Sequence, residues 1–432
     1  MIAYMRRALP LLLAMFAIVA PSCPRQYGPA DYDPDATDRF RAYPSDADLV
    51  YVAGASAKGD SVYVIAMPGG DVVSRIDGPD RRSWAVAGNR AYYTSTRAGS
   101  STTLHRIDLR SGERTRLGRD DRPGMRILDD RGPVFSALAL TADGTEVLVA
   151  RTLADGPRAW LGWYDAATGA LRRELSWAMH EEAGSVRLAR FARDAFALVA
   201  FEGRDGRVTA QQLHVVDASA REIASLDTSQ LPPATACSPD FVAFGADRWG
   251  TVCSWRSARY GAALMLDIGS HVSGSTTLEF VGDEIPLAWL PTDGGMSVLT
   301  DRARRLVVGP GGSVQSFPID PQPTGASVRS IARLGEGRMV LGWVGSGDGS
   351  TSSGVALIDT ATGRVLSRTK VDGIVLGLAV ASERLYVLSA SASQPPKVGR
   401  IDAGSLVQLG PAVPVMRQGD IEVSGISIVA PP

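Results

Sequence analysis

Short apolar stretches recur along the chain at intervals of roughly 48 residues, and each is followed by runs rich in Val, Tyr, Leu and Ala. Runs such as 146–151 and 384–389 have the β-branched and aromatic content that favours strands. A repeat of this length with four short strands predicts a β-propeller blade, because one four-stranded sheet cannot cover both its faces until it stacks on neighbours. The apolar stretches lie at 84–87, 136–140, 186–191, 234–238, 285–290, 327–334, 374–380 and 425–430.

Helical patterning is absent from this repeat. No window sustains a 3.6-residue apolar period outside the N-terminus, and 46 Gly with 26 Pro interrupt the chain every few residues. We therefore expect an all-β fold, with residues 49–432 forming a single β-propeller domain of four-stranded blades.

The two ends of the array complement each other. Residues 49–78 hold three strand-like runs with no apolar stretch before them, whereas the stretch at 425–430 has no strands after it. Pairing of the N- and C-terminal strands would complete this blade, close the ring and remove two exposed sheet edges. The count is then eight blades. Seven is the alternative, because the unit from 234 to 284 is poorly patterned.

A short turn motif separates the last two strands of several units. It reads Asp-x-x-Thr-Gly at 165–169 and 359–363, and Asp-x-x-Ser-Gly at 108–112. The Asp carboxylate accepts hydrogen bonds from turn amides and the Gly adopts a positive φ, so the motif predicts a hairpin between the two outer strands of a blade.

At these residues the chain resembles the propellers of the pyrroloquinoline-quinone-repeat and YVTN-repeat families. The resemblance spans most of residues 49–430 and implies a blade scaffold. It does not imply quinone binding, because the Ala two before the Asp and the Trp four after the Gly of the quinoprotein pattern are replaced by Trp163 and Arg173 in one unit and by Leu357 and Ser367 in another.

The N-terminus predicts export. Arg6 and Arg7 precede an apolar run at 8–20 that is short for a membrane span and typical of a signal peptide. Residues 20–23 resemble the lipobox of bacterial lipoproteins, so we expect a signal segment at 1–23 with lipidation at Cys23; simple cleavage near Ala20 or Ser22 is the alternative. The Pro- and Asp-rich segment 24–48 predicts a flexible tether.

The remaining cysteines suit an oxidising compartment. Cys237 and Cys253 lie in one unit, sixteen positions apart, where two antiparallel strands can bring them together. A disulfide and two buried thiols are both compatible with this spacing.

Charge and motifs exclude several functions. The 45 basic and 46 acidic residues leave no net field for nucleic acid. Serine-hydrolase, zinc-protease, Walker and dinucleotide motifs are all missing, and only four His are present. The sequence therefore assigns no catalytic residue, no metal ligand and no cofactor.

Two groups of residues are candidates for binding. The long connection 118–135 carries charges of both signs, and connections of this length are often functional. A second segment concentrates the Trp, Tyr and Arg side chains that are enriched in binding hot spots. The candidates are Asp120, Asp121, Arg122, Arg126, Asp129, Asp130 and Arg131 in the first group, and Arg248, Trp249, Trp255, Arg256 and Tyr260 in the second.

These features favour a protein of the cell envelope, in the periplasm or at the cell surface, that binds an envelope protein or a small-molecule ligand while a lipid anchor holds it to the membrane. A propeller hydrolase or lactonase with its site at the channel mouth is the main alternative, and a surface carbohydrate-binding protein is another.

Overall fold

The computed structural model describes residues 44, 46–56, 59–77, 84–96, 102–108, 111–125, 136–181, 183–192, 195–204, 207–227, 235–237, 242–243, 248–255, 260–267, 274–281, 284–292, 295–309, 312–319, 326–335, 337–347, 350–381, 383–391, 394–414 and 427–429. The expected signal segment, Cys23 and nearly all of the expected tether lie outside these residues.

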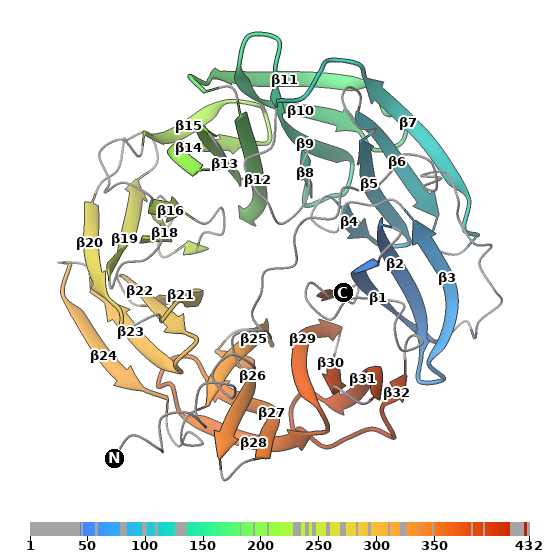
Figure 1. Ribbon diagram of the computed structural model, residues 1–432, viewed down its shortest axis with the longest axis vertical. Coiled ribbons are helices and arrows are strands. Elements are labelled where there is room, and N and C mark those ends of the chain that lie inside the picture. Colours follow the sequence, from blue (N-terminus) through green and yellow to red (C-terminus); the bar gives the residue numbers. More distant parts are fainter. Residues whose placement is uncertain are drawn as a thin grey trace, which may run out of the picture.

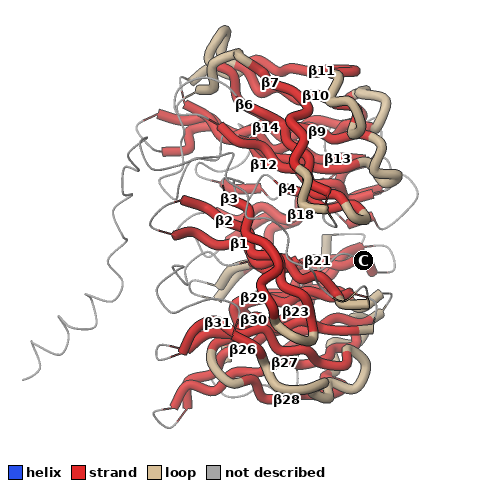
Figure 2. The backbone as a smooth tube through the Cα atoms, turned by 90° about the vertical axis from the view of Figure 1, so that its right-hand side faces the viewer, coloured by secondary structure: helices blue, strands red, loops and turns tan. Residues whose placement is uncertain are grey.

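Every regular element of the described residues is a β-strand, which confirms the all-β prediction (Figure 2). Among these residues, no helix has the length and apolar character needed to span a bilayer.

The strands form eight antiparallel sheets within the described residues, seven of them four-stranded and one five-stranded. Sheet A contains β1 (Asp48–Ser56), β2 (Gly59–Met67), β3 (Asp71–Asp77) and β33 (Ser427–Val429); sheet B contains β4 (Trp84–Ala87), β5 (Arg90–Thr96), β6 (Thr102–Asp108) and β7 (Arg114–Asp120); sheet C contains β8 (Ser136–Leu140), β9 (Glu146–Leu153), β10 (Arg158–Asp165) and β11 (Leu171–Ala178); sheet D contains β12 (Ala183–Ala192), β13 (Ala195–Arg204), β14 (Arg207–Asp217) and β15 (Glu222–Asp227).

The second half of the chain repeats this arrangement. Sheet E contains β16 (Thr235–Cys237), β17 (Val242–Ala243), β18 (Arg248–Trp255), β19 (Tyr260–Asp267) and β20 (Gly274–Glu279); sheet F contains β21 (Pro286–Thr292), β22 (Gly295–Thr300), β23 (Arg304–Val308) and β24 (Val314–Pro318); sheet G contains β25 (Ser327–Arg333), β26 (Arg338–Gly347), β27 (Ser350–Asp359) and β28 (Val365–Val371); sheet H contains β29 (Ile374–Ala381), β30 (Arg384–Ser391), β31 (Gln394–Asp402) and β32 (Val413–Pro414).

The sheets follow one another around a common centre, and the chain in most of them runs from the innermost strand outwards (Figure 1). The apolar stretches of the repeat become the innermost strands, including β4, β8, β25 and β29. This order places two kinds of connection on one face of the molecule, namely the connectors between sheets and the turns between the two middle strands of a sheet. The turns between the two outer strands lie on the opposite face.

The first and last sheets meet. β33 pairs with β1 through Tyr51↔Val429, Val52↔Ile428 and Ala53↔Ser427, and the C-terminus lies beside β1 (Figure 1). Sheets A and H also share a buried apolar cluster, formed by side chains that include Val50 and Ile65 from A and Tyr386 and Leu388 from H. Asp48 adds polar contacts to this seam, because it accepts hydrogen bonds from Arg384 and Tyr386.

The predicted turn motif has the expected geometry. The Asp165 Oδ1 atom accepts hydrogen bonds from the backbone N of Thr168 at 2.7 Å and of Ala167 at 3.0 Å, and Gly169 has φ +72°. The motif joins the two outer strands in sheets B, C and G. Sheet H carries a variant that the sequence pattern missed: Asp402 caps the turn in the same way, but Leu406 occupies the positive-φ position at 57°.

The two expected disulfide cysteines lie opposite each other in sheet E. The register of β16 and β18 pairs Cys237 with Cys253, and Cys253 is disulfide-bonded. The predicted partnership between the two residues is therefore compatible with the strand register.

Candidate functional site

Asp120, the last residue of β7, precedes the connector to β8, and two arginines bind its carboxylate. The Arg122 guanidinium donates to Asp120 through Nε at 2.9 Å and through Nη2 at 2.8 Å, and the backbone N of Arg122 donates to the same carboxylate at 3.1 Å. Arg151 of the next sheet places Nη1 2.8 Å from Asp120 Oδ2. Because Asp120 belongs to sheet B and Arg151 to sheet C, this ion pair joins two sheets.

Arg151 is almost inaccessible to solvent, with only 2% of its side chain exposed. Its Nη2 atom donates to the backbone carbonyl oxygen of Arg122 at 3.0 Å. Burial lowers the pKa of Arg151, and the neighbouring Asp120 carboxylate opposes this shift. A charge this deeply buried is tolerated only with such a partner.

The pKa of Asp120 shows which effect prevails at the pair. Burial would raise this pKa, but the hydrogen bonds from Arg122 and the charge of Arg151 outweigh burial, so the pKa is lowered. Asp120 is therefore an ionised structural anchor. A cavity of about 10 Å³, the volume that one water molecule needs, lies beside the pair and is also lined by Tyr164, whose pKa burial raises to about 12.

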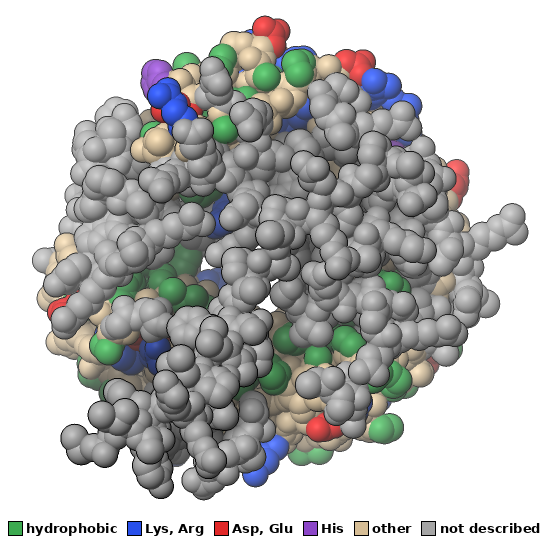
Figure 3. Space-filling model, in the orientation of Figure 1, with side chains coloured by type: hydrophobic (Ala, Val, Ile, Leu, Met, Phe, Trp, Pro, Cys, Tyr) green, Lys and Arg blue, Asp and Glu red, His purple; other side chains and the backbone are tan. Residues whose placement is uncertain are grey.

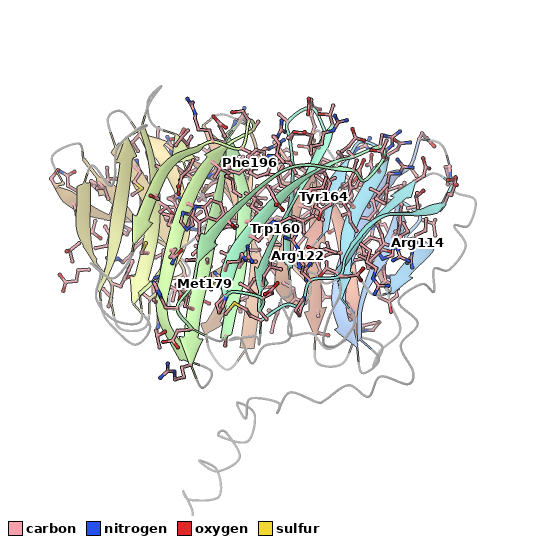
Figure 4. All side chains as sticks on the ribbon, turned by 90° about the horizontal axis from the view of Figure 1, so that it is seen from above. Arg114, Arg122, Trp160, Tyr164, Met179 and Phe196 are labelled. Atoms are coloured by element: carbon pink, nitrogen blue, oxygen red, sulfur yellow. The ribbon has the colours of Figure 1, made fainter. Side chains whose placement is uncertain are left out.

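Arg122 also covers an aromatic ring. Its guanidinium lies 4.4 Å from the centroid of the Trp160 ring, and the Trp160 Nε1 atom donates to Glu174 at 2.8 Å (Figure 4). Glu174 in turn lies 3.6 Å from Arg122 Nη1. Stacking on Trp fixes the planar guanidinium while leaving it at the surface.

Backbone bonds extend the anchored segment to Met125. Met125 N donates to the carbonyl oxygen of Thr152 at 3.3 Å, and Ala154 N donates to that of Pro123 at 2.9 Å. The first part of the connector is thus attached to residues at the turn between β9 and β10.

Two further connectors on this face are held by acids in a similar way. Glu202, which is 1% exposed, accepts hydrogen bonds from the backbone N of His180 and Glu181 between β11 and β12, and from Gln212 Nε2 at 2.9 Å. Glu284, which is 4% exposed, accepts from the backbone N of Val281 at 2.9 Å between β20 and β21. These acids lie outside the turn motif and recur at no fixed position of the repeat, so their role could not be predicted from the sequence pattern.

A stacked histidine supports the second connector. The His214 ring stacks on Trp177 with a centroid distance of 4.2 Å, and its Nδ1 atom lies 2.7 Å from Glu222. This arrangement confirms the structural placement of His214 within a strand.

The structure describes three residues of the first candidate group, and their role in binding stays a prediction. Asp120 ends strand β7 and is not part of a loop, and its charge, like that of Arg122, is used internally. Asp121 is 73% exposed and forms an ion pair with Arg119. Arg126, Asp129, Asp130 and Arg131 lie outside the described residues.

Four residues of the second group lie in strands, and their role in binding also stays a prediction. The expected binding connection is part of the sheet, because Arg248, Trp249 and Trp255 belong to one continuous strand, β18, and Tyr260 begins β19. Arg256 lies outside the described residues. The aromatic content of this segment is thus typical of a propeller strand.

No group of metal ligands is assembled in the part of the chain that the structure describes. There, no three His, Cys, Asp or Glu side chains lie close enough together to hold a metal ion.

Comparison with known proteins addresses the fold. No protein-family model matches the chain, and no curated protein does. Among solved structures, the dihydro-heme d1 dehydrogenase NirN is similar at 16% identity and a TM-score of 0.51, over 92% of this chain and 82% of that one. The Dos1 propeller is similar at 12% identity and a TM-score of 0.51, over 90% of this chain and 100% of that one.

A prolyl endopeptidase structure is more distant, at 15% identity and a TM-score of 0.47 over 77% of this chain. The present chain spans about half of that enzyme's length, 49%. The likeness to NirN and to the Dos1 propeller concerns the fold alone, and it supports a β-propeller.

Proposed function

We propose that this protein is an exported, envelope-tethered β-propeller that acts as an interaction scaffold, and that its contact surface is the face on which the connectors between sheets emerge. The observation that carries the proposal is the anchoring of these connectors. Asp120, Glu202 and Glu284 each bind connector backbone, so the loops start from fixed positions. Binding loops on a rigid frame lose less entropy when a partner binds.

A crosslinking experiment tests this surface. We expect that substitution of Arg126, Asp129, Asp130 and Arg131 by Ser abolishes an in-cell crosslink between the full-length protein and one envelope protein, detected by pull-down and mass spectrometry. The substitutions leave Asp120, Arg122 and Arg151 intact, so the anchor of the connector is retained.

The control is the pair Arg221→Ser and Arg364→Ser, which removes charges from turns on the opposite face and should leave the crosslink unchanged. Retention of the crosslink in the connector variant would place the contact elsewhere. If no partner is captured by any of the three proteins, the scaffold proposal is wrong.

The alternatives find less support. A hydrolase or lactonase would place acidic or His side chains at the channel mouth, and none of the innermost strands that the structure describes carries Asp, Glu or His. A carbohydrate-binding surface around Trp249 and Tyr260 has no further observation in its favour, and the two residues belong to strands β18 and β19.

We propose further that the eight sheets form one ring of eight blades, closed by the pairing of β33 with β1. A chain ending at Ser424 lacks β33, and we expect its free energy of unfolding to fall by roughly 2 kcal/mol, since a few net hydrogen bonds are lost. Urea denaturation of the purified protein measures this change. Removal of Pro431 and Pro432 alone is the control and should have no effect; equal stability of the two truncated chains would exclude closure by β33.

A further inference from the structure

Three successive innermost strands share a β-bulge near their first residues. The register with the second strand shifts between Pro286 and Ala288 in β21, between Val328 and Ser330 in β25, and between Val375 and Gly377 in β29. One residue at each bulge has no partner in the neighbouring strand. Because the bulge recurs at one position of the repeat, we compare the residues that occupy it.

In sheets F and H the bulge residue has a packing role. Leu287 and Leu376 are half-buried and pack against the apolar clusters between the sheets. Sheet G has Arg329 at the same position, and its side chain is exposed. Leu therefore fits at this position of the repeat. Because Arg329 is exposed, packing of the apolar core does not explain why Arg stands here. Bulges redirect side chains and are frequent beside functional sites.

Arg329 belongs to a group of cations on the innermost strands. Arg333 lies on the same strand, and Arg187 and Arg190 lie on β12 of sheet D; all four are exposed. The described innermost strands contain no Asp or Glu. Hydrophobic and basic side chains border the recessed wall beside the central opening (Figure 3). The wall is therefore apolar and positively charged, although the whole chain is nearly neutral.

Contacts of these arginines hold them in place. Arg190 Nη1 donates to the carbonyl oxygen of Leu140 at 3.3 Å, and Arg333 Nη2 donates to that of Trp289 at 2.9 Å. Each bond reaches the innermost strand of the preceding sheet. The Arg187 guanidinium lies 5.4 Å from the centroid of the Phe201 ring. Arg190 and Arg333 are thus each held by one donor to a backbone carbonyl, and Arg187 is held by an aromatic ring.

The spacing of the charges matches an extended polypeptide. Arg329 and Arg333 are four positions apart, about 13 Å along a strand, whereas Arg187 and Arg190 are three positions apart and leave β12 on opposite faces. Carboxylates four residues apart on an extended chain have the same separation as Arg329 and Arg333. In addition, β12 and β25 are each the last strand of their sheet on the side of the centre, so one backbone edge of each is unpaired within the sheet.

We infer that the central channel binds an extended, acidic segment of a protein partner, with Arg329 as its main anchor and Arg333, Arg187 and Arg190 as secondary contacts. Carboxylates of the segment accept charge-assisted hydrogen bonds from the guanidinium groups, and its backbone lies along the unpaired edge of an innermost strand. This site is distinct from the connector surface, so it can be tested with a peptide whether or not the connectors bind a partner.

The test uses the full-length protein and a synthetic peptide with Glu at every fourth position and Ser or Thr between. Isothermal titration should show binding of this peptide and none of the same peptide with Gln in place of Glu. Arg329→Leu should weaken binding by about tenfold, the loss of one charge-assisted hydrogen bond. Because sheets F and H carry Leu at the bulge, the melting temperature of Arg329→Leu should not fall.

The matched control is Arg368→Leu, which removes an exposed Arg from β28, the outermost strand of the same sheet. It should bind the peptide like the wild type. The inference is wrong if Arg329→Leu and Arg368→Leu bind equally well, or if the Gln peptide binds as tightly as the Glu peptide. Binding of succinate without binding of the peptide would identify a small-anion site and would also overturn it.

Discussion

Replacement of Arg151 by Ala is expected to lower the free energy of unfolding by about 3–5 kcal/mol, the usual cost of breaking a buried ion pair from one side. The substitution leaves the Asp120 carboxylate without its partner in sheet C and removes the hydrogen bond to the Arg122 carbonyl. It also leaves a cavity between two sheets. Urea denaturation, followed by Trp fluorescence, measures the change.

An exposed arginine provides the control. Arg172→Ala removes an ion pair with Asp165 at a side chain that is 55% exposed, and should change stability far less than Arg151→Ala, because solvent screens an exposed pair. The double variant Asp120→Asn, Arg151→Met should recover part of the loss, because no charge is then left unpaired. If Arg151→Ala and Arg172→Ala are equally stable, the pair does not join the sheets.

The ion pair of Asp120 and Arg151 should also make the stability of the protein depend on pH in the acid range. The pKa of Asp120 in the folded protein lies below its ordinary value of 3.8, so its contribution to stability is complete above that value and is lost as the pH falls through the folded pKa. The stability of Asp120→Asn should therefore depend less on pH below about 4 than that of the wild type.

Two glycines of the turn motif should respond differently to the same substitution. Gly169 and Gly363 have φ values of +72° and +73°, so Ala is strained at both by about 1–2 kcal/mol. At Gly169 a Cβ atom would lie 2.3 Å from the carbonyl oxygen of Leu117 in the neighbouring sheet, whereas at Gly363 the nearest atom is Arg305 Cδ at 3.4 Å. Gly169→Ala must therefore also displace backbone, at an additional cost of about 1–3 kcal/mol.

The expected result is a loss of about 2–5 kcal/mol for Gly169→Ala and about 1–2 kcal/mol for Gly363→Ala. Thermal and urea denaturation of the two variants make the comparison. Since both positions have the same φ and lie in the same motif, any difference reports on the contact between sheets B and C. Equal losses would mean that the turn around Gly169 relaxes without strain.

The repeat made the fold predictable. Residues 84–87 and 136–140 were expected as the first strands of their units and correspond to β4 and β8 residue for residue. A strand that is covered on both faces must be apolar along its length, and the packing of each sheet on its neighbours imposes the same pattern in every unit. The Asp-x-x-Thr-Gly turn was predictable for a similar reason, because its geometry depends on residues that are adjacent in sequence.

The site was less predictable because its contacts cross between units. The charges of Asp120 and Arg122 indicated a binding loop, yet Arg151, which pairs with Asp120, lies about thirty positions away inside an apolar strand. Glu202 and Glu284 are single acids at strand and loop ends, with no local signal. The role of Arg329 could be inferred only from the strand register, which places it at the bulge position that Leu287 and Leu376 occupy in two other sheets.

The apolar clusters of the described residues lie between sheets, and each combines side chains of two sheets. Side chains of sheets F and G form one cluster, those of G and H form another, and those of H and A form a third. The interface between sheets H and A is therefore built like the interfaces between sheets that follow each other in the chain. A circularly permuted protein that begins at β4 and ends with β3, its original ends joined by a linker, would keep every one of these clusters. By contrast, removal of one sheet would expose the apolar face of the sheet on either side of it. A change in the number of sheets would therefore require all the sheets to rearrange.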